Sequence, residues 1–304
     1  RQEISIGFTV LGINVLIVNG LTNILQFWNV IYLRDLPWFL NQCFVLSKDF
    51  KNFAIQNQMK RKSEEVDILA LCIASFALPC LPIFVGFLLS SVLNPEFPLL
   101  LSSVISLPGY SNYLAILLSS LSFAFYMLAI FGGPAIIGMA AITYAILIDQ
   151  ILSHLTINSS NLSYKHFLTV YRKLKILEIH MNSMFSPLAL LVQIYFMQEI
   201  VVSCFAAIRS SEASFVVLGT VLGLNAAQII VTVIRLTAGI YDKSAQLLSS
   251  RTKSHRLSPI SRRIQRSLRP LYTWVGGMYY ADSGLTFTIL DITQGQTIDL
   301  LLAN

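Results

Sequence analysis

The sequence predicts an all-α protein, a bundle of helices that crosses a lipid bilayer several times. Of its 304 residues, 55% are hydrophobic and only 12% are charged, whereas a soluble globular protein typically carries about 25% charged residues. So few polar groups cannot cover a soluble surface of this size, and lipid is the natural solvent for the apolar excess. The net charge of +6 does not indicate nucleic acid, because the basic residues fall in separate loops without interleaved aromatic side chains.

Six regions are long and apolar enough to span a bilayer, which takes about 20 mostly apolar residues. They are residues 4–28, 66–92, 113–152, 181–208, 215–241 and 272–303. We expect them to form one transmembrane domain over residues 1–304. The second contains Pro79 and Pro82, which predict a kink. The sixth is the least apolar, because three aspartates and two glutamines interrupt it.

The third region is too long for one straight crossing. A helix of its 40 residues would extend roughly 60 Å, about twice the hydrocarbon core. Gly132, Gly133 and Pro134 could hinge a hairpin of two short spans. The charge pattern favours a single crossing instead, bent near Pro134 because proline removes a backbone donor. We expect this helix to project past the membrane.

The basic residues predict the topology. Eighteen of the 21 lie in the loops that follow the first, third and fifth regions, and basic loops are typically cytoplasmic. With six spans these loops share one side, around Lys60, Lys173 and Arg262, and the C-terminus is extracellular. The sequence begins with Arg1 rather than Met and has no readable signal peptide. We therefore expect a preceding helix, which gives seven spans and a cytoplasmic N-terminus in the full chain.

One signal conflicts with this topology. Asn158-Ser-Ser160 and Asn161-Leu-Ser163 are both glycosylation sequons, and they lie in a loop that the charges place in the cytoplasm. Sequons occur often by chance, so the charge asymmetry is the stronger signal. We expect both sequons to be unused.

The sequence contains no catalytic, metal-binding or cofactor-binding motif that we can identify. Its four histidines lie outside any HExxH pattern, and the two glycine pairs match neither GxxxxGK[ST] nor GxGxxG. Its four cysteines, Cys43, Cys72, Cys80 and Cys204, form no CxxC and are expected to be reduced and buried. We expect a protein that is not an enzyme and that holds no metal and no cofactor.

The sixth region carries a narrow stripe of small and acidic residues. At about 100° per residue, five of them fall within about 60–80° of one another on a helix: Gly284, Thr288, Asp291, Gly295 and Asp299. Repeated around a symmetric oligomer, the aspartates would form acidic rings that favour cations, with Asp299 nearest the external mouth. The alternative is that the segment packs inside one subunit, where other helices pair with its acids, or does not span the membrane.

Aromatic residues are frequent in the external halves of the first three spans. Together they could line an apolar pocket for a small organic ligand, and the candidates are Phe84, Phe87, Tyr113, Phe123 and Tyr126. Aromatic side chains also anchor helices at the membrane interface and pack between helices, so this pattern alone leaves both roles open.

Several segments resemble the arthropod odorant and gustatory receptor superfamily of seven-helix chemoreceptors. The first is Tyr171-Arg-Lys-Leu-Lys-Ile-Leu177, which leads into the fourth span with Asn182. The very short loop between the fourth and fifth spans is the second. The third is the C-terminal stretch, in which Arg266-Ser-Leu-Arg-Pro-Leu271 precedes Gly284-Leu-Thr-Phe-Thr288 and Thr297-Ile-Asp-Leu-Leu-Leu302. This stretch is similar to the final helix of a divergent gustatory-type member. Thr286-Phe287 stands for the family's Thr-Tyr pair, whereas Thr293-Gln294 lacks the aromatic residue of its second motif.

The resemblance implies a ligand-gated cation channel of the plasma membrane. In such receptors four subunits, identical or mixed, assemble so that the final helix lines the pore, and a small organic ligand binds among the earlier helices. A secondary transporter of a small solute is the alternative. It would favour inverted repeats and broken helices around a midplane site, and we find no internal repeat. A G-protein-coupled receptor has the opposite orientation.

Overall fold

The computed structural model describes residues 20–32, 34–56, 138–158, 162–210, 213–252 and 258–303. Most of these residues are helical. The helices are 20–31, α2 (Asp35–Gln56), Gly138–Ile157, α5 (Tyr164–Arg209), α6 (Ala213–Thr252), α7 (Pro259–Ser267) and α8 (Leu285–Ala303). A single hairpin of two short strands, β1 (Trp274–Val275) and β2 (Tyr279–Tyr280), interrupts the helices of this described part. The prediction of an all-α bundle is confirmed.

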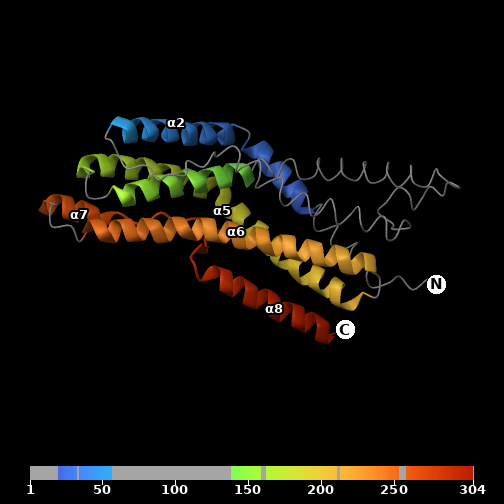
Figure 1. Cartoon of the computed structure of the whole chain (residues 1–304). Helices are drawn as coiled ribbons and strands as arrows, with labels where there is room; N and C mark the ends of the chain where they lie inside the picture. The colour runs from blue at the N-terminus through green and yellow to red at the C-terminus, as the bar shows by residue number, and fades with distance from the viewer. Residues whose placement is uncertain are drawn as a thin grey trace, which may run out of the picture.

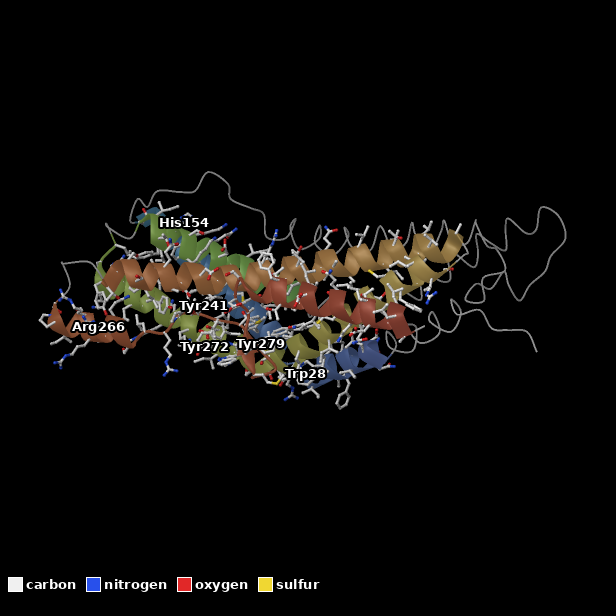
Figure 2. All side chains as sticks on the ribbon, turned by 90° about the horizontal axis from the view of Figure 1, so that it is seen from below. Trp28, His154, Tyr241, Arg266, Tyr272 and Tyr279 are labelled. Carbon is white, nitrogen blue, oxygen red and sulfur yellow. The ribbon has the colours of Figure 1, made fainter. Side chains whose placement is uncertain are left out.

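The helices form an elongated bundle around the pair α5 and α6 (Figure 1). α2, the helix Gly138–Ile157 and α7 lie along one half of this bundle, and α8 lies along the other half, where the C-terminus is found. We call the first half the basic half, because α7 and the adjacent part of α5 together carry seven basic residues. His154 and Arg266 mark this half in Figure 2.

Three helices of the described part are suited by length and composition to crossing a membrane: Gly138–Ile157, Tyr164–Arg209 and Val216–Thr252. They overlap the third, fourth and fifth predicted spans. The expected bend near Pro134 and most of the first two spans lie outside the described residues. α8 does not meet the same criterion, because two aspartates and two glutamines lower its hydropathy.

The basic segments that were expected as loops are largely helical. α5 begins at Tyr164, about 17 residues before the predicted span, which adds roughly 25 Å of helix. Phe167, Tyr171, Leu174 and Leu177 are buried in this extension, and their spacing of three or four residues is that of an amphipathic helix. A search for continuous apolar runs overlooks this periodicity, so the extension was read as a loop.

A well-packed core fills the basic half. Phe39 of α2, Tyr144 and Ile148 of the helix Gly138–Ile157, and Leu174 of α5 are each no more than 1% exposed. Polar contacts close the edges of this core. The Tyr171 hydroxyl donates to the Arg269 carbonyl at 2.8 Å, and Lys243 of α6 forms an ion pair with Asp149. The basic half is therefore a folded unit rather than a set of flexible connections.

The sequon at Asn158, which conflicts with the predicted topology, is inaccessible in the folded chain. The Asn158 side chain is only 4% exposed, and its amide nitrogen, the atom that would carry a glycan, donates to the His154 carbonyl at 3.0 Å. The folded chain has no room for a glycan at this position. Asn161 lies outside the described residues.

α5 and α6 pack closely against each other at two glycines of α6. A Cβ atom on Gly219 would lie 2.8 Å from the Ser203 carbonyl oxygen, and one on Gly223 would lie 3.3 Å from the Ser203 Cβ. The two glycines are four residues apart, which is the spacing that lets membrane helices pack backbone against backbone. This crossing joins the two long helices in the half that also carries α8.

We predict that Gly219→Ala destabilises the protein by about 1–3 kcal/mol, because the added methyl group meets the Ser203 backbone and forces the helices apart. Gly239→Ala is the matched control on the same helix, since a Cβ there meets nothing within 4 Å and alanine favours helix. Thermal unfolding of the detergent-solubilised protein measures both. Equal melting temperatures for the two variants would contradict the close crossing.

We predict that Cys43 resists thiol reagents. Its side chain is 1% exposed, and burial raises the pKa of the thiol to about 12. The reactive thiolate would then be about one part in ten thousand at pH 8. Maleimide labelling of a chain that retains Cys43 as its sole cysteine should be slow in native membranes and rapid in denaturant. Ser267→Cys, at an exposed position, is the control. Labelling of both sites at one rate would contradict the burial.

Candidate functional site

The structure corrects the start of the sixth predicted span. Residues 272–284 form a hairpin rather than helix, and only Leu285–Ala303 is helical. Trp274 pairs with Tyr280 and Val275 with Tyr279 in antiparallel register. Gly276 and Gly277 turn the chain with φ of +62° and +71°, a conformation that is unstrained only for glycine. The glycine pair and the flanking aromatic residues are typical of a hairpin, and this signal was available in the sequence.

α8 begins at a defined cap. The Asp282 carboxylate accepts a hydrogen bond from the Leu285 backbone N–H at 2.9 Å, which satisfies one of the donors that a helix leaves free at its first turn. Its negative charge also suits the positive end of the helix dipole. The 19 residues of α8 extend about 28 Å, close to the thickness of a hydrocarbon core of about 30 Å.

One face of α8 packs against the rest of the chain. Thr286, Ile289 and Thr293 are its buried residues. Ile289 is 1% exposed and belongs to a small apolar cluster with Ile200 of α5 and with residues of α6. The Thr293 hydroxyl donates to the Ile289 carbonyl at 2.9 Å within α8. A narrow buried row, with Ile289 as its apolar centre, therefore holds the helix to α5 and α6.

Four of the five predicted pore-lining residues occupy the opposite face of α8, and the fifth, Gly284, directly precedes the helix. Helical geometry at about 100° per residue puts the centre of this stripe about 150° from the buried row. All five are exposed in the single chain: Gly284, Thr288, Asp291, Gly295 and Asp299. Among the described residues, neither Asp291 nor Asp299 has an ion-pair partner. The alternative in which these acids pair inside one subunit receives no support from the described residues.

The exposed side of α8 also carries large apolar residues. Phe287 is 76% exposed and Leu302 is 81% exposed. At about 100° per residue, Leu302 falls within the polar stripe and Phe287 falls beside it. Sequence reasoning selected only the small and acidic positions and missed these two. An apolar patch rimmed by polar groups is typical of a surface that contacts another protein or lipid.

Arg209 lies near the C-terminal end of α8. It ends α5, and its guanidinium donates to the Leu301 carbonyl at 3.4 Å. Sequence reasoning gave this residue no role. A guanidinium at a helix C-terminus interacts favourably with the helix dipole and with free carbonyls. Arg209 thus holds the far end of α8 against α5.

α5 carries a buried carboxylate that sequence reasoning missed. Glu199 is 6% exposed, and it accepts a hydrogen bond from the Ser203 hydroxyl at 3.3 Å. Asn225 of α6 is buried too. The available signal was a lone acidic residue inside the fourth apolar span, and such residues often have functional roles in membrane proteins.

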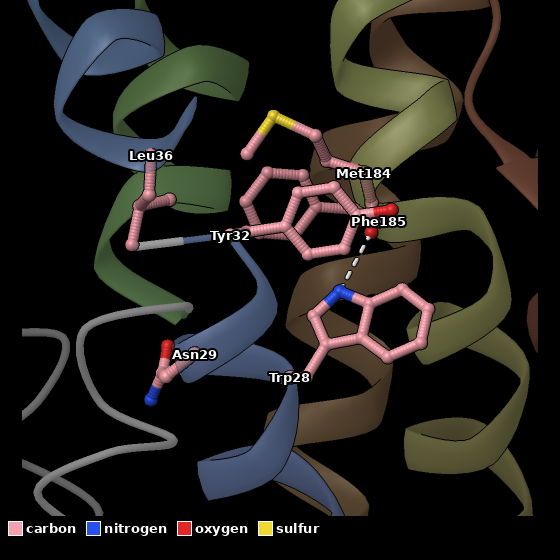
Figure 3. A pocket seen from close by; sticks show the side chains of 6 residues that line it. All are labelled: Trp28, Asn29, Tyr32, Leu36, Met184 and Phe185. Carbon is pink, nitrogen blue, oxygen red and sulfur yellow. Dashed lines mark hydrogen bonds between the residues drawn. The ribbon is translucent and has the colours of Figure 1, made fainter. Parts of the chain in front are cut away.

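The predicted ligand-binding residues, Phe84, Phe87, Tyr113, Phe123 and Tyr126, all lie outside the described residues. A small hollow does occur between the helix 20–31, α2 and α5. Its lining includes Trp28, Tyr32 and Phe185 (Figure 3). Its volume of about 10 Å³ is near that of a single water site, whereas pockets for small organic ligands have about 300–1,000 Å³. This hollow is too small to be the expected ligand pocket.

The arrangement of helices is similar to that of a solved chemoreceptor. The insect olfactory receptor OR5 from Machilis hrabei superposes on this chain with a TM-score of 0.70 and 14% sequence identity, over 99% of this chain and 83% of the receptor chain. The same receptor in complex with eugenol gives a TM-score of 0.66 and 13% identity, over 100% of this chain and 84% of the receptor chain. No protein-family model matches the sequence, and no curated protein matches it.

The chain therefore has the fold of an insect olfactory receptor. This agreement, found over nearly the whole chain, confirms at the level of fold the resemblance seen in the C-terminal segments. It also agrees with the expectation of a helical membrane protein, which three apolar helices support independently.

We predict that α8 has one water-accessible face and one packed face. Cysteines introduced singly at Thr288 and Asp299 should react with a charged, membrane-impermeant thiol reagent, because both positions are exposed. A cysteine at Thr293, which is 3% exposed, should react at least tenfold more slowly. Labelling of Thr288→Cys and Asp299→Cys only by a membrane-permeant reagent would mean that the stripe faces lipid instead of water.

Proposed function

We propose that this chain is a subunit of a chemosensory receptor of the odorant or gustatory type, which binds a small organic ligand and opens a cation path through the plasma membrane. The observation that carries the proposal is the placement of α8, whose polar stripe is directed away from its own subunit. The fold of an olfactory receptor supports the sensory role.

In the proposed channel, copies of α8 surround a common axis. The resemblance to the chemoreceptor superfamily implies four copies. Asp291 and Asp299 would then form two acidic rings, which raise the local cation concentration and disfavour anions. Gly284 and Gly295 carry no side chain that narrows the path. Water in the path would solvate the carboxylates, which lipid cannot do.

The proposed ligand site lies in the external half, among the aromatic residues Phe84, Phe87, Tyr113, Phe123 and Tyr126. OR5 in complex with eugenol supports a small organic molecule as the class of ligand. Eugenol is the ligand in the OR5 complex. The ligand of this chain is to be found by screening small organic molecules of similar size.

A secondary transporter of a small solute is the second candidate. Buried Glu199 favours it, because an acidic residue between membrane helices can bind a coupling ion or proton. The two candidates differ in the response of the cell to the ligand. A channel passes far more ions than the number of ligand molecules taken up, whereas a transporter accumulates the labelled substrate inside the cell.

We predict that cells expressing the full-length chain show ligand-evoked cation current, and that Asp299→Asn lowers the cation-over-anion permeability ratio by roughly tenfold. Asp291→Asn should act in the same direction. Surface expression should be unchanged, because among the described residues neither carboxylate has an ion-pair partner. Patch-clamp measurement of reversal potentials provides the readout.

Asp49→Asn is the control, since it removes an exposed carboxylate that pairs with Lys173 in the basic half. It should leave permeability unchanged. Unaltered selectivity in both Asp291→Asn and Asp299→Asn would remove the pore assignment. Substrate accumulation without current would favour the transporter.

A further inference from the structure

The hairpin before α8 is attached to one face of α5. Side chains at Asn182, Ser186 and Gln193 of α5 take part in this attachment, together with Leu190. At about 100° per residue, these four positions lie within about 80° of one another. α5 thus presents a continuous stripe to the hairpin over about three turns.

Asn182 and Ser186 each bond the hairpin backbone twice. The Asn182 amide donates to the Tyr272 carbonyl at 2.9 Å and accepts from the Trp274 N–H at 2.8 Å. The Ser186 carbonyl accepts from the Gly276 N–H at 2.8 Å, and its hydroxyl accepts from the Gly277 N–H at 3.0 Å. These bonds replace the partners that the short strands lack, so the hairpin depends on α5 for its conformation.

Gly276 is the tightest point of this contact. A Cβ atom there would lie 2.7 Å from the Leu190 Cδ2 atom and 3.1 Å from its Cβ. At Gly277 a Cβ would meet nothing within 4 Å, although its φ is positive as well. The two neighbouring glycines therefore share a positive φ, but only Gly276 is packed against α5.

The attachment is at a proline-containing turn of α5. Pro187 lies inside the helix and leaves the Ser183 carbonyl without a helical donor. Two nearby carbonyls receive donors from outside the helix. Ser186 accepts from the hairpin, and Met184 accepts from the Trp28 indole N–H at 3.0 Å (Figure 3). The same turn thus contacts the helix 20–31 on one side and the hairpin on another.

The hairpin is also fixed by aromatic contacts on the α6 side. The ring centroids of Tyr241 of α6 and Tyr280 lie 4.9 Å apart. On the α5 side, the Lys175 ammonium lies 4.5 Å from the centre of the Tyr272 ring. Figure 2 shows Tyr241, Tyr272 and Tyr279 together near the middle of the molecule. The Tyr279 hydroxyl donates to the Gln193 side chain at 2.9 Å. The hairpin therefore sits at the junction between the basic half and α8.

We propose that Asn182, Ser186 and Leu190 of α5 are positioning residues for α8, acting through the hairpin. A shift of the Pro187 turn moves the hairpin, and the Asp282 cap passes that movement to the first turn of α8. This inference rests on the proposed function, because the movement matters only if α8 lines a gated path. It names the hairpin as the element that would transmit movement from the proposed ligand-binding helices to that path.

The test compares Gly276→Ala with Gly277→Ala and adds Leu190→Ala. Both positions require a positive φ, so both alanines carry similar backbone strain, but only Gly276→Ala meets Leu190. We expect Gly276→Ala to shift the half-maximal ligand concentration by roughly tenfold, within the usual range of coupling between sites. Gly277→Ala should shift it less. The double variant Gly276→Ala/Leu190→Ala should return toward wild type, because it removes the Leu190 Cδ2 atom at 2.7 Å and leaves only the milder Cβ contact at 3.1 Å.

Surface expression is measured for every variant, and Ser183→Ala is the neutral control, since its exposed hydroxyl bonds only within α5. A structural defect alone would lower expression and maximal current together without shifting the half-maximal concentration. Equal shifts for Gly276→Ala and Gly277→Ala, or no rescue by Leu190→Ala, would overturn the proposal.

A second measurement does not depend on current. A cysteine at Thr288 reports the position of α8 through its rate of modification by a charged thiol reagent. Gly276→Ala should change this rate at least threefold, Gly277→Ala should change it less, and Leu190→Ala should restore it. If the wild-type chain gave no ligand-evoked current, the proposed function would fail, but these labelling rates would still test whether α5 positions α8 through the hairpin. If ligand-evoked currents were normal but the labelling rate were the same in all variants, the positioning role would be wrong and the proposed channel would be unaffected.

Discussion

The structure depends on the hydrogen bonds that the hairpin makes to Ser186 of α5. A hairpin of two short strands cannot satisfy its own backbone polar groups. The carbonyl and hydroxyl of Ser186 accept hydrogen bonds from the N–H groups of Gly276 and Gly277, and α5 thus supplies acceptors that the hairpin lacks. The path of the chain into α8 follows from these bonds, and so does the direction in which α8 presents its polar face.

The two halves of the bundle are held by different amounts of packing. Large side chains such as Tyr144, Phe39 and Phe167 are fully buried in the basic half. α8, in contrast, rests on a narrow row centred on Ile289 and is secured at its two ends by Asp282 and Arg209. Burial of apolar surface is the main source of stability. Among the described residues, the element proposed to move is therefore held by less apolar packing than the helices of the basic half.

The sequence was sufficient for the helical class and for the face of α8 that carries Asp291 and Asp299, because both follow from local composition and helical periodicity. It was insufficient for the basic segments, where helices such as α5 continue on a mixed pattern that resembles a loop. It also failed at Tyr272, where apolar composition concealed a hairpin. Contacts such as Trp28 with Met184, 156 residues apart, have no local signal and come only from tertiary packing.

The exposed face of α8 has a consequence for biogenesis. A newly inserted single copy would hold two carboxylates, together with Phe287 and Leu302, outward from its own fold. In a bilayer this arrangement is unfavourable for the acids. In the proposed channel, neighbouring copies would relieve it by enclosing water between them, and completion of the fold would then be tied to assembly. An orphan subunit would carry a recognisable mark of its unassembled state, which quality control in the secretory pathway could read before the protein reaches the cell surface.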